Sequence, residues 1–338
     1  MKRICVLPGD GIGPEVVDCA VEVLKHATDK LEFTYADIGQ SAKVKRGSYL
    51  PDETFDLMKS SDSCLFGAVT SSEDREYTSP VLTFRKELDL FANVRPVKSL
   101  VLLQGRPSID VVIIRENSEG LYNREEIFDD KGVTTLRRVT KAASERIVSF
   151  AIHYSRENGR KRLCCVHKAN VLRGSDGLFL QTFRRLMESQ QEHLKKEEQL
   201  VDSAALKLVI EPTAFDVIVT LNLYGDILSD VAAGVAGGLG FAPSGNIGPQ
   251  HSVFEPSHGS APDISGKGIA NPTATILAGA MMLMHLGLDD ASKAVERAVS
   301  ETYGTGHLTH DLGGRHGSKS FTNHVIKNLQ GETTARSR

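Results

Sequence analysis

The chain has 338 residues, 40% of them hydrophobic and 25% charged, which is typical of one large or two moderate globular domains. A formal net charge of −3, without a basic stripe interleaved with aromatics, gives no electrostatic support for nucleic-acid binding. No apolar run approaches the roughly 20 residues that cross a bilayer, and Met1 is followed by a strand-like run rather than a leader. We therefore expect a cytoplasmic protein with no membrane partner.

The five cysteines are odd in number and show no Cys-x-x-Cys spacing, which argues against a disulfide framework or a zinc site. Most lie in apolar stretches. We expect buried free thiols at Cys5, Cys19, Cys64, Cys164 and Cys165.

Strand-like and helical patterns alternate along the chain. The expected strands cover residues 4–7, 63–66, 111–114, 163–166, 206–210 and 217–220, and the expected helices cover 14–27, 52–60, 142–157, 177–188 and 272–286. This alternation predicts an α/β fold with a mixed, largely parallel sheet. The polar run 188–199 has mixed charge signs and predicts a solvated helix face or loop.

A glycine-rich turn follows the first predicted strand and precedes the first helix. Gly9, Gly11 and Gly13 have the spacing Gly-x-Gly-x-Gly, whereas a Rossmann dinucleotide site needs Gly-x-Gly-x-x-Gly. We therefore predict a tight structural turn, with Pro14 at the first helical position, rather than a Rossmann fold.

Three arginines stand at the ends of apolar segments. Ser79 caps a predicted helix that begins at Pro80, so Val81 and Leu82 share a face with Arg85. Each such arginine alone is compatible with an ordinary surface residue. Three that converge would clamp a substrate rich in carboxylates, and the others are Arg95 and Arg115.

Two further side chains are candidates for proton transfer. Lys168 directly follows a buried strand, which is costly unless its ammonium meets carboxylates or has a task, and the Tyr122 hydroxyl is a potential proton donor. Taken singly, both are also compatible with ordinary strand-end positions.

Asp226 and Asp230 form an Asp-x-x-x-Asp pair just after a strand-like run, which places two carboxylates one helical turn apart on one face. Oxygen ligands with open positions suit Mg²⁺ or Mn²⁺ holding a substrate. Alone, such a pair most often marks a solvated helix start. The clamp and the pair together point to one ligand, a polycarboxylate bridged to a divalent metal.

Taken together, these motifs resemble the metal-dependent, NAD(P)-linked β-decarboxylating dehydrogenases, the isocitrate, 3-isopropylmalate and homoisocitrate dehydrogenase family. The matching stretches run in family order across residues 9 to 272. They are Gly9-Asp-Gly-Ile-Gly, Arg85 with Asn93-Val-Arg95-Pro, Arg115-Glu-Asn-Ser-Glu-Gly-Leu-Tyr, His167-Lys-Ala-Asn, Asn222-Leu-Tyr-Gly-Asp-Ile-Leu-Ser-Asp, Glu255-Pro-Ser-His-Gly-Ser-Ala-Pro-Asp-Ile and Ile269-Ala-Asn-Pro. One departure is His310, where the family usually has proline.

The resemblance implies an isopropylmalate dehydrogenase-like two-domain fold. Residues 1–97 plus 246–338 would form an outer, cofactor-binding domain, and 98–245 an inner domain for dimerisation and metal binding, in a homodimer or higher homo-oligomer with shared active sites. Arg85, Arg95 and Arg115 would bind the substrate carboxylates. Asp226 and Asp230 would bind the metal, with Asp202, Lys168 and Asn170 supplied across the dimer.

The resemblance also implies a reaction. Lys168 or a linked water would accept the substrate hydroxyl proton as hydride leaves to the nicotinamide, and Tyr122 would protonate the enolate after CO₂ is lost. The cofactor would lie along Thr70 and the loop from His258 through Gly259, Ser260, Ala261 and Asp263 to Ile264, with Asn271 near the adenine. Because a carboxylate at Asp263 would accept from ribose hydroxyls and repel a 2′-phosphate, we predict NAD rather than NADP.

The substrate is the open question. The segment Tyr77 to Arg85 most resembles homoisocitrate dehydrogenases, which predicts conversion of homoisocitrate to 2-oxoadipate. Apolar Val81 and Leu82 are equally compatible with the isopropyl group of 3-isopropylmalate, and isocitrate ranks third because Val81 replaces a polar residue. A non-catalytic regulatory subunit and a metal-dependent hydratase or aldolase are the alternatives from other classes.

Overall fold

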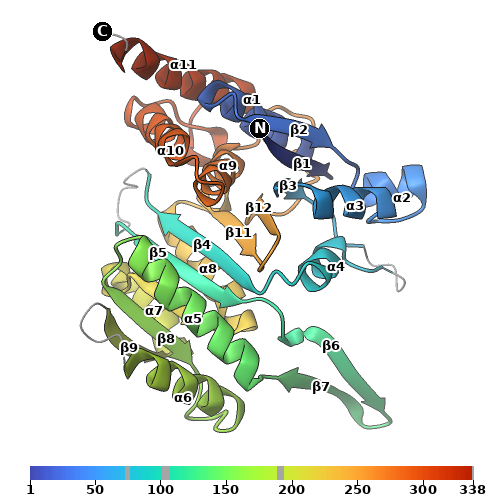
Figure 1. The fold of residues 1–338 in the computed structure, drawn as a ribbon, viewed down its shortest axis with the longest axis vertical. Coiled ribbons are helices and arrows are strands. Elements are labelled where there is room, and N and C mark those ends of the chain that lie inside the picture. The colour runs from blue at the N-terminus through green and yellow to red at the C-terminus, as the bar shows by residue number, and fades with distance from the viewer. Residues whose placement is uncertain (73–76, 101–106, 189–193, 337–338) are drawn as a thin grey trace. The chain divides into compact units, whose positions relative to one another are not determined.

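The computed structural model describes residues 1–72, 77–100, 107–188 and 194–336 (Figure 1). The chain divides into two compact units. The first comprises Met1–Leu88, Gly237–Gly245 and Pro249–Arg338, and the second comprises Asp89–Ala236 and Asn246–Gly248. In the described part of the chain, no helix is long and apolar enough to cross a membrane.

The first unit contains parallel strands flanked by helices. Strand β1 (Lys2–Gly9) pairs in parallel with β2 (Leu31–Tyr35) and β3 (Ser63–Ala68), and β3 pairs with β12 (Ser252–Pro256). The helices are α1 (Gly13–Ala27), α2 (Gln40–Arg46), α3 (Asp52–Ser60), α4 (Pro80–Glu87), α9 (Thr273–His285), α10 (Asp289–Gly304) and α11 (Ser318–Arg336). Strand β11 (Pro243–Ile247) begins in this unit and ends in the second.

The glycine-rich turn is structural, as predicted. Gly9 has a φ of +77°, and a Cβ there would lie 1.9 Å from the carbonyl oxygen of Ala68, so only glycine fits. Pro14 stands in the first turn of α1, where its missing N–H has no cost.

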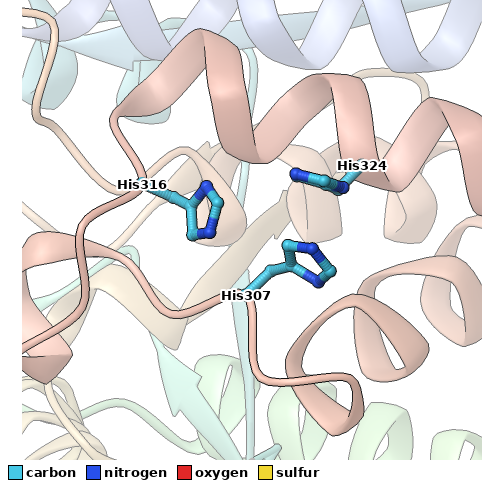
Figure 2. Close-up of side chains that lie close together, drawn as sticks. All are labelled: His307, His316 and His324. Carbon is cyan, nitrogen blue, oxygen red and sulfur yellow. The ribbon is translucent and has the colours of Figure 1, made fainter.

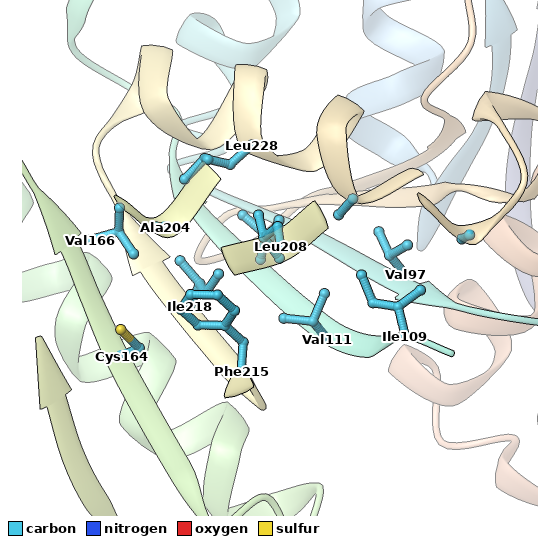
Figure 3. Close-up of a cluster of buried hydrophobic side chains, with 13 residues drawn as sticks. Val97, Ile109, Val111, Cys164, Val166, Ala204, Leu208, Phe215, Ile218 and Leu228 are labelled. Carbon is cyan, nitrogen blue, oxygen red and sulfur yellow. The ribbon is translucent and has the colours of Figure 1, made fainter. Parts of the chain in front are cut away.

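The second unit is built on β5 (Asp110–Glu116), which pairs with antiparallel β4 (Ala92–Lys98) and parallel β10 (Val217–Thr220). Strands β8 (Arg162–His167) and β9 (Lys195–Leu200) continue the parallel part. The remaining elements are the hairpin β6 (Gly120–Asp129) and β7 (Gly132–Arg138), and the helices α5 (Lys141–Glu157), α6 (Ser175–Met187), α7 (Val201–Ile210) and α8 (Asn222–Ala236). Figure 3 shows core side chains of this unit, where Ile218 of β10 packs with Leu208 of α7 and Leu228 of α8.

The predicted α/β fold with a mixed, largely parallel sheet is confirmed. The five cysteines are buried and free, also as predicted.

Two element predictions were wrong. Residues 206–210 form the end of helix α7, because Ala204 and Leu208 face the core one turn apart while Leu206 is exposed. A short apolar run cannot distinguish a strand from such a helix. Residues 189–193 of the polar run lie outside the described residues, and residues 195–199 belong to strand β9, whose backbone pairs with β8.

The compact units divide after Leu88, whereas the expected outer domain extended to residue 97. Strand β4 belongs with the second unit because it pairs along its whole length with β5. The cofactor-binding and dimerising roles of the two domains remain predictions.

Candidate active site

Asp226 and Asp230 lie one turn apart on α8, directly after buried strand β10. The helix approaches β5 closely, since a Cβ at Gly225 would lie 2.6 Å from Cβ of Arg115. Glycine at this position therefore sets the distance between the carboxylates of α8 and the arginine at the end of β5.

Two buried guanidinium groups face these carboxylates. Nη1 of Arg115 donates to Asp226, and Nη1 of Arg95 lies 3.3 Å from Oδ1 of Asp226 and 3.6 Å from Oδ1 of Asp230. The Arg115 side chain is only 1% exposed, whereas that of Asp230 is 55% exposed. The cluster thus has positive charge held inside and carboxylate oxygens reaching solvent.

Neutral side chains fix both guanidinium groups. Nε of Arg115 donates to Oδ1 of Asn222 at 2.9 Å, and Arg95 donates to Asn93 at 2.8 Å and to Ser229 at 2.7 Å. Because these hydrogen bonds satisfy donors of each buried guanidinium group, they hold both arginine side chains in one orientation.

Tyr122 joins the cluster from β6. Its hydroxyl donates to Oδ2 of Asp226, and the Arg115 guanidinium carbon lies 4.8 Å from the centre of its ring. Burial raises the pKa of Tyr122, Arg115 opposes this, and the bond to Asp226 adds to the rise. The phenol is therefore protonated at neutral pH and is a possible proton donor. Burial likewise raises the pKa of Asp230, which Arg95 opposes.

Lys168 and Asp202 form a separate pair, with Nζ of Lys168 2.6 Å from Oδ1 of Asp202. This bond lowers the pKa of Asp202, which is exposed, as is Asn170. In the described residues, carboxylate oxygens of Asp202, Asp226 and Asp230 do not all lie within 4.8 Å of one another. One chain therefore does not assemble the three predicted metal ligands.

Arg85 lies in the first unit, on α4, with the Ser79 cap predicted from the sequence. It forms a buried ion pair with Glu255, at 2.8 Å, while its Nε is buried and has no hydrogen-bond partner among the described residues. Val81 and Leu82, on the same helix, are half-buried.

Two of the predicted cofactor residues, Thr70 and Ser260, meet beside the glycine-rich turn. Oγ1 of Thr70 donates to Oγ of Ser260 at 2.7 Å, and the carbonyl of Ser260 accepts from N–H of Ile12 at 2.8 Å. A Cβ at Gly11 would lie 1.9 Å from that carbonyl, so the loop and the turn are in direct contact.

The remaining residues of the loop differ in burial and in packing contacts. Burial lowers the pKa of His258, whose Nε2 is buried without a hydrogen-bond partner in the described chain. Ala261 (φ 38°) and Ile264 pack against the apolar cluster of Ile12, Val16 and Ala270, which indicates a structural contribution. Gly259 and Asp263 are exposed.

Asn271, the residue predicted to lie near the adenine, is buried, and its Nδ2 donates to Asp311 at 3.0 Å.

Several supporting residues were not singled out from the sequence. The carboxylate of Asp10 accepts N–H groups of Gln40, Ser41 and Thr70 at 2.9 to 3.1 Å, and thereby ties three segments together. Asp10, Asn222 and Glu255 all lie inside the motifs that match the family, and this was the sequence signal that could have found them. No sequence signal linked Asp311 to Asn271, because only the fold brings these two residues together.

The chain is similar to several known proteins. The family model described as isocitrate/isopropylmalate dehydrogenase matches residues 3–329. The chain is 46% identical to an "isocitrate/homoisocitrate dehydrogenase" of Thermus thermophilus, over 97% of this chain and 98% of that protein. It is 44% identical to a "3-isopropylmalate/3-methylmalate dehydrogenase" of Methanocaldococcus jannaschii, over 98% of this chain and all of that one. Its structure matches an isocitrate dehydrogenase of Methylococcus capsulatus with a TM-score of 0.93 at 40% identity, covering 97% and 99% of the two chains.

Proposed function

We propose that this protein oxidises and decarboxylates homoisocitrate to 2-oxoadipate, with NAD as the oxidant and Mg²⁺ or Mn²⁺ as the metal. The chain belongs to the isocitrate/isopropylmalate dehydrogenase family over nearly its whole length, and it is a β-decarboxylating dehydrogenase acting on a small polycarboxylate. The observation that carries the proposal is the buried cluster in which Arg95, Arg115 and Tyr122 all contact Asp226.

The donor set fits a hard divalent cation. Asp226 and Asp230 present carboxylate oxygens on one helix face, and oxygen is the ligand that Mg²⁺ and Mn²⁺ prefer. Asp202 is exposed and does not form a three-carboxylate group with them in the described chain, which supports its predicted contribution to a second copy of the chain. We accordingly propose a homodimer with shared active sites.

When bound, the divalent cation lowers the hydroxyl pKa and withdraws electron density from the reacting carbons, while NAD accepts the hydride. Arg95 and Arg115, already buried and oriented, bind the carboxylates of the malate core. Lys168 or a linked water accepts the hydroxyl proton during oxidation. Tyr122 delivers a proton to the carbon that has lost CO₂, which its protonated state at neutral pH supports.

The two proton-transfer roles predict different losses in the half-reactions. Tyr122→Phe should impair decarboxylation more than reduction of a supplied 2-oxo acid, whereas Lys168→Ala should impair both. Equal losses for Tyr122→Phe would remove that assignment.

The loop around Ser260 fits a dinucleotide, because its backbone lies against the glycine-rich turn and His258 offers a buried, unpartnered Nε2. We propose that the exposed carboxylate of Asp263 favours NAD by binding ribose hydroxyls and repelling a 2′-phosphate. Asp263→Lys should shift preference toward NADP. A wild-type enzyme that prefers NADP contradicts this.

Substrate preference depends on the groups next to Arg85. Val81 and Leu82 lie one turn before it on α4, and we propose that they contact whatever the substrate carries beyond its malate core. The methylene of homoisocitrate can rest on Val81, whereas 3-isopropylmalate would bury its branch against both residues. Since one methylene changes transition-state binding by only about 1 to 3 kcal/mol, some cross-activity is expected.

The test is kcat/KM for homoisocitrate, 3-isopropylmalate and isocitrate with Mg²⁺ and NAD. Homoisocitrate should give the highest value. A tenfold or greater preference for 3-isopropylmalate would assign the enzyme to that substrate instead, as the half-buried apolar pair allows.

A further inference from the structure

Three histidines, none of them assigned above to substrate or cofactor, meet in the first unit. They are His307, after α10, His316, before α11, and His324, within α11 (Figure 2). One ring nitrogen of each lies within 4.8 Å of those of the other two. All three side chains are half-buried, so they remain accessible to a small ion.

The backbone fixes where these side chains originate. His316 is held by a bridge to Thr309 and by its N–H, which donates to the carbonyl of Leu308 at 3.1 Å. His324 lies on α11 beside Val325, which is fully buried in the core. The three Cα positions therefore belong to packed backbone rather than to a free end.

Hydroxyl groups orient two of the rings. Nδ1 of His307 lies 3.0 Å from Oγ1 of Thr305, and Nδ1 of His316 lies 2.9 Å from Oγ of Ser320. When Nδ1 donates these bonds, the lone pair is on Nε2, which is how proteins present an imidazole to a metal.

The charge state also suits a cation ligand. Burial and the neighbouring His307 lower the pKa of both His316 and His324, and Arg315 and Lys327 respectively add to this. The two rings are therefore neutral at neutral pH, the form that binds metal.

We propose that His307, His316 and His324 form a site for Zn²⁺, with three imidazole ligands and a fourth position open to water or a small anion. Zn²⁺ takes nitrogen ligands at about 2.0–2.1 Å in tetrahedral geometry, which requires the three nitrogens to close to roughly 3.4 Å from one another. The rings of His307 and His324 have centroids 3.6 Å apart and planes tilted by 35°, so one of them must also rotate to point its ring edge at the ion. Binding would fasten α11 to the segment before it.

The test is Zn²⁺ titration of the full chain in excess Mg²⁺, against a chromophoric chelator. The cysteines do not compete, since all five are buried. One Zn²⁺ should bind per chain, with affinity reduced at least tenfold in His324→Gln and in His316→Gln. His153→Gln is the matched control, because that side chain is 70% exposed on α5 and should leave the affinity unchanged.

Co²⁺ absorption reports the ligand type independently of affinity. The wild type and His153→Gln should show the visible bands of tetrahedral nitrogen coordination, and the cluster variants should lose them. If His324→Gln does not fold, His307→Gln supplies the same comparison. Zn²⁺ affinity and Co²⁺ bands that are equal in wild type and cluster variants, or absent in all, overturn the proposal.

Discussion

The contact between α8 and β5 can be tested with two glycines on one helix. A methyl group at Gly225 would lie 2.6 Å from Cβ and 2.7 Å from Cγ of Arg115, distances at which something must shift. At Gly234, on the same helix, nothing lies within 4 Å of the same methyl position.

The two substitutions should therefore change stability in opposite directions. Overpacking costs about 1–3 kcal/mol, from which the helix preference for alanine removes about 0.5–1, so Gly225→Ala should destabilise by up to about 2.5 kcal/mol. Gly234→Ala meets no obstacle and should stabilise by about 0.4–1 kcal/mol.

Urea unfolding monitored by circular dichroism measures both values. Because a shift at Gly225 displaces Arg115 relative to Asp226, Gly225→Ala should also lower kcat/KM, while Gly234→Ala should keep it. Equal stability and equal activity of the two variants would refute the close approach of α8 to the buried arginine.

Three further predictions follow from individual contacts. Asp226→Asn should keep the circular dichroism spectrum, because Arg95 and Arg115 retain their neutral partners, but should lose orders of magnitude in Mg²⁺-dependent turnover; wild-type activity that survives EDTA would sink this. Glu255→Gln leaves Arg85 buried without its anion, so the free energy of unfolding measured in urea should fall by about 3–5 kcal/mol. Asp37→Asn breaks a surface ion pair and should lower it by less than about 1 kcal/mol. Similar losses in the two variants would contradict this prediction. Burial lowers the pKa of His167, whose Nδ1 accepts a hydrogen bond from N–H of Ala169. Below about pH 6.5 the unfolded state therefore binds more protons than the folded state. The free energy of unfolding should fall as pH falls, by at most about 1.4 kcal/mol per pH unit. His167→Asn should flatten that slope and His153→Asn should not; an unchanged slope in His167→Asn would exclude this histidine.

The sequence predicted helices and strands correctly where hydrophobic periodicity and capping or turn residues indicate the same element. Ser79 followed by Pro80 starts α4, and the apolar run 217–220 forms β10 and is followed by the helix with the two aspartates. It failed at α7, where only packing of Ala204 and Leu208 on one face decides for a helix. It failed also at β9, because an edge strand made of charged residues has no apolar signature.

The candidate site, too, could be predicted from the sequence only in part. Spacing alone placed Asp226 and Asp230 on one helix face, but the contacts of Arg95 and Arg115 with Asp226 join residues more than 100 positions apart. Such contacts follow from strand order, which local pattern does not reveal. The salt bridge of Arg85 with Glu255 was missed for this reason, although both residues stood in matching motifs.

The proposed function requires this chain to release CO₂ from homoisocitrate in a reaction that needs both NAD and a divalent metal. The most direct measurement is the yield of CO₂ and NADH from homoisocitrate by metal-loaded and EDTA-treated enzyme. One CO₂ and one 2-oxoadipate should form per NADH with Mg²⁺, and neither after chelation. NADH formed without CO₂, or full turnover in EDTA, would contradict the proposed reaction.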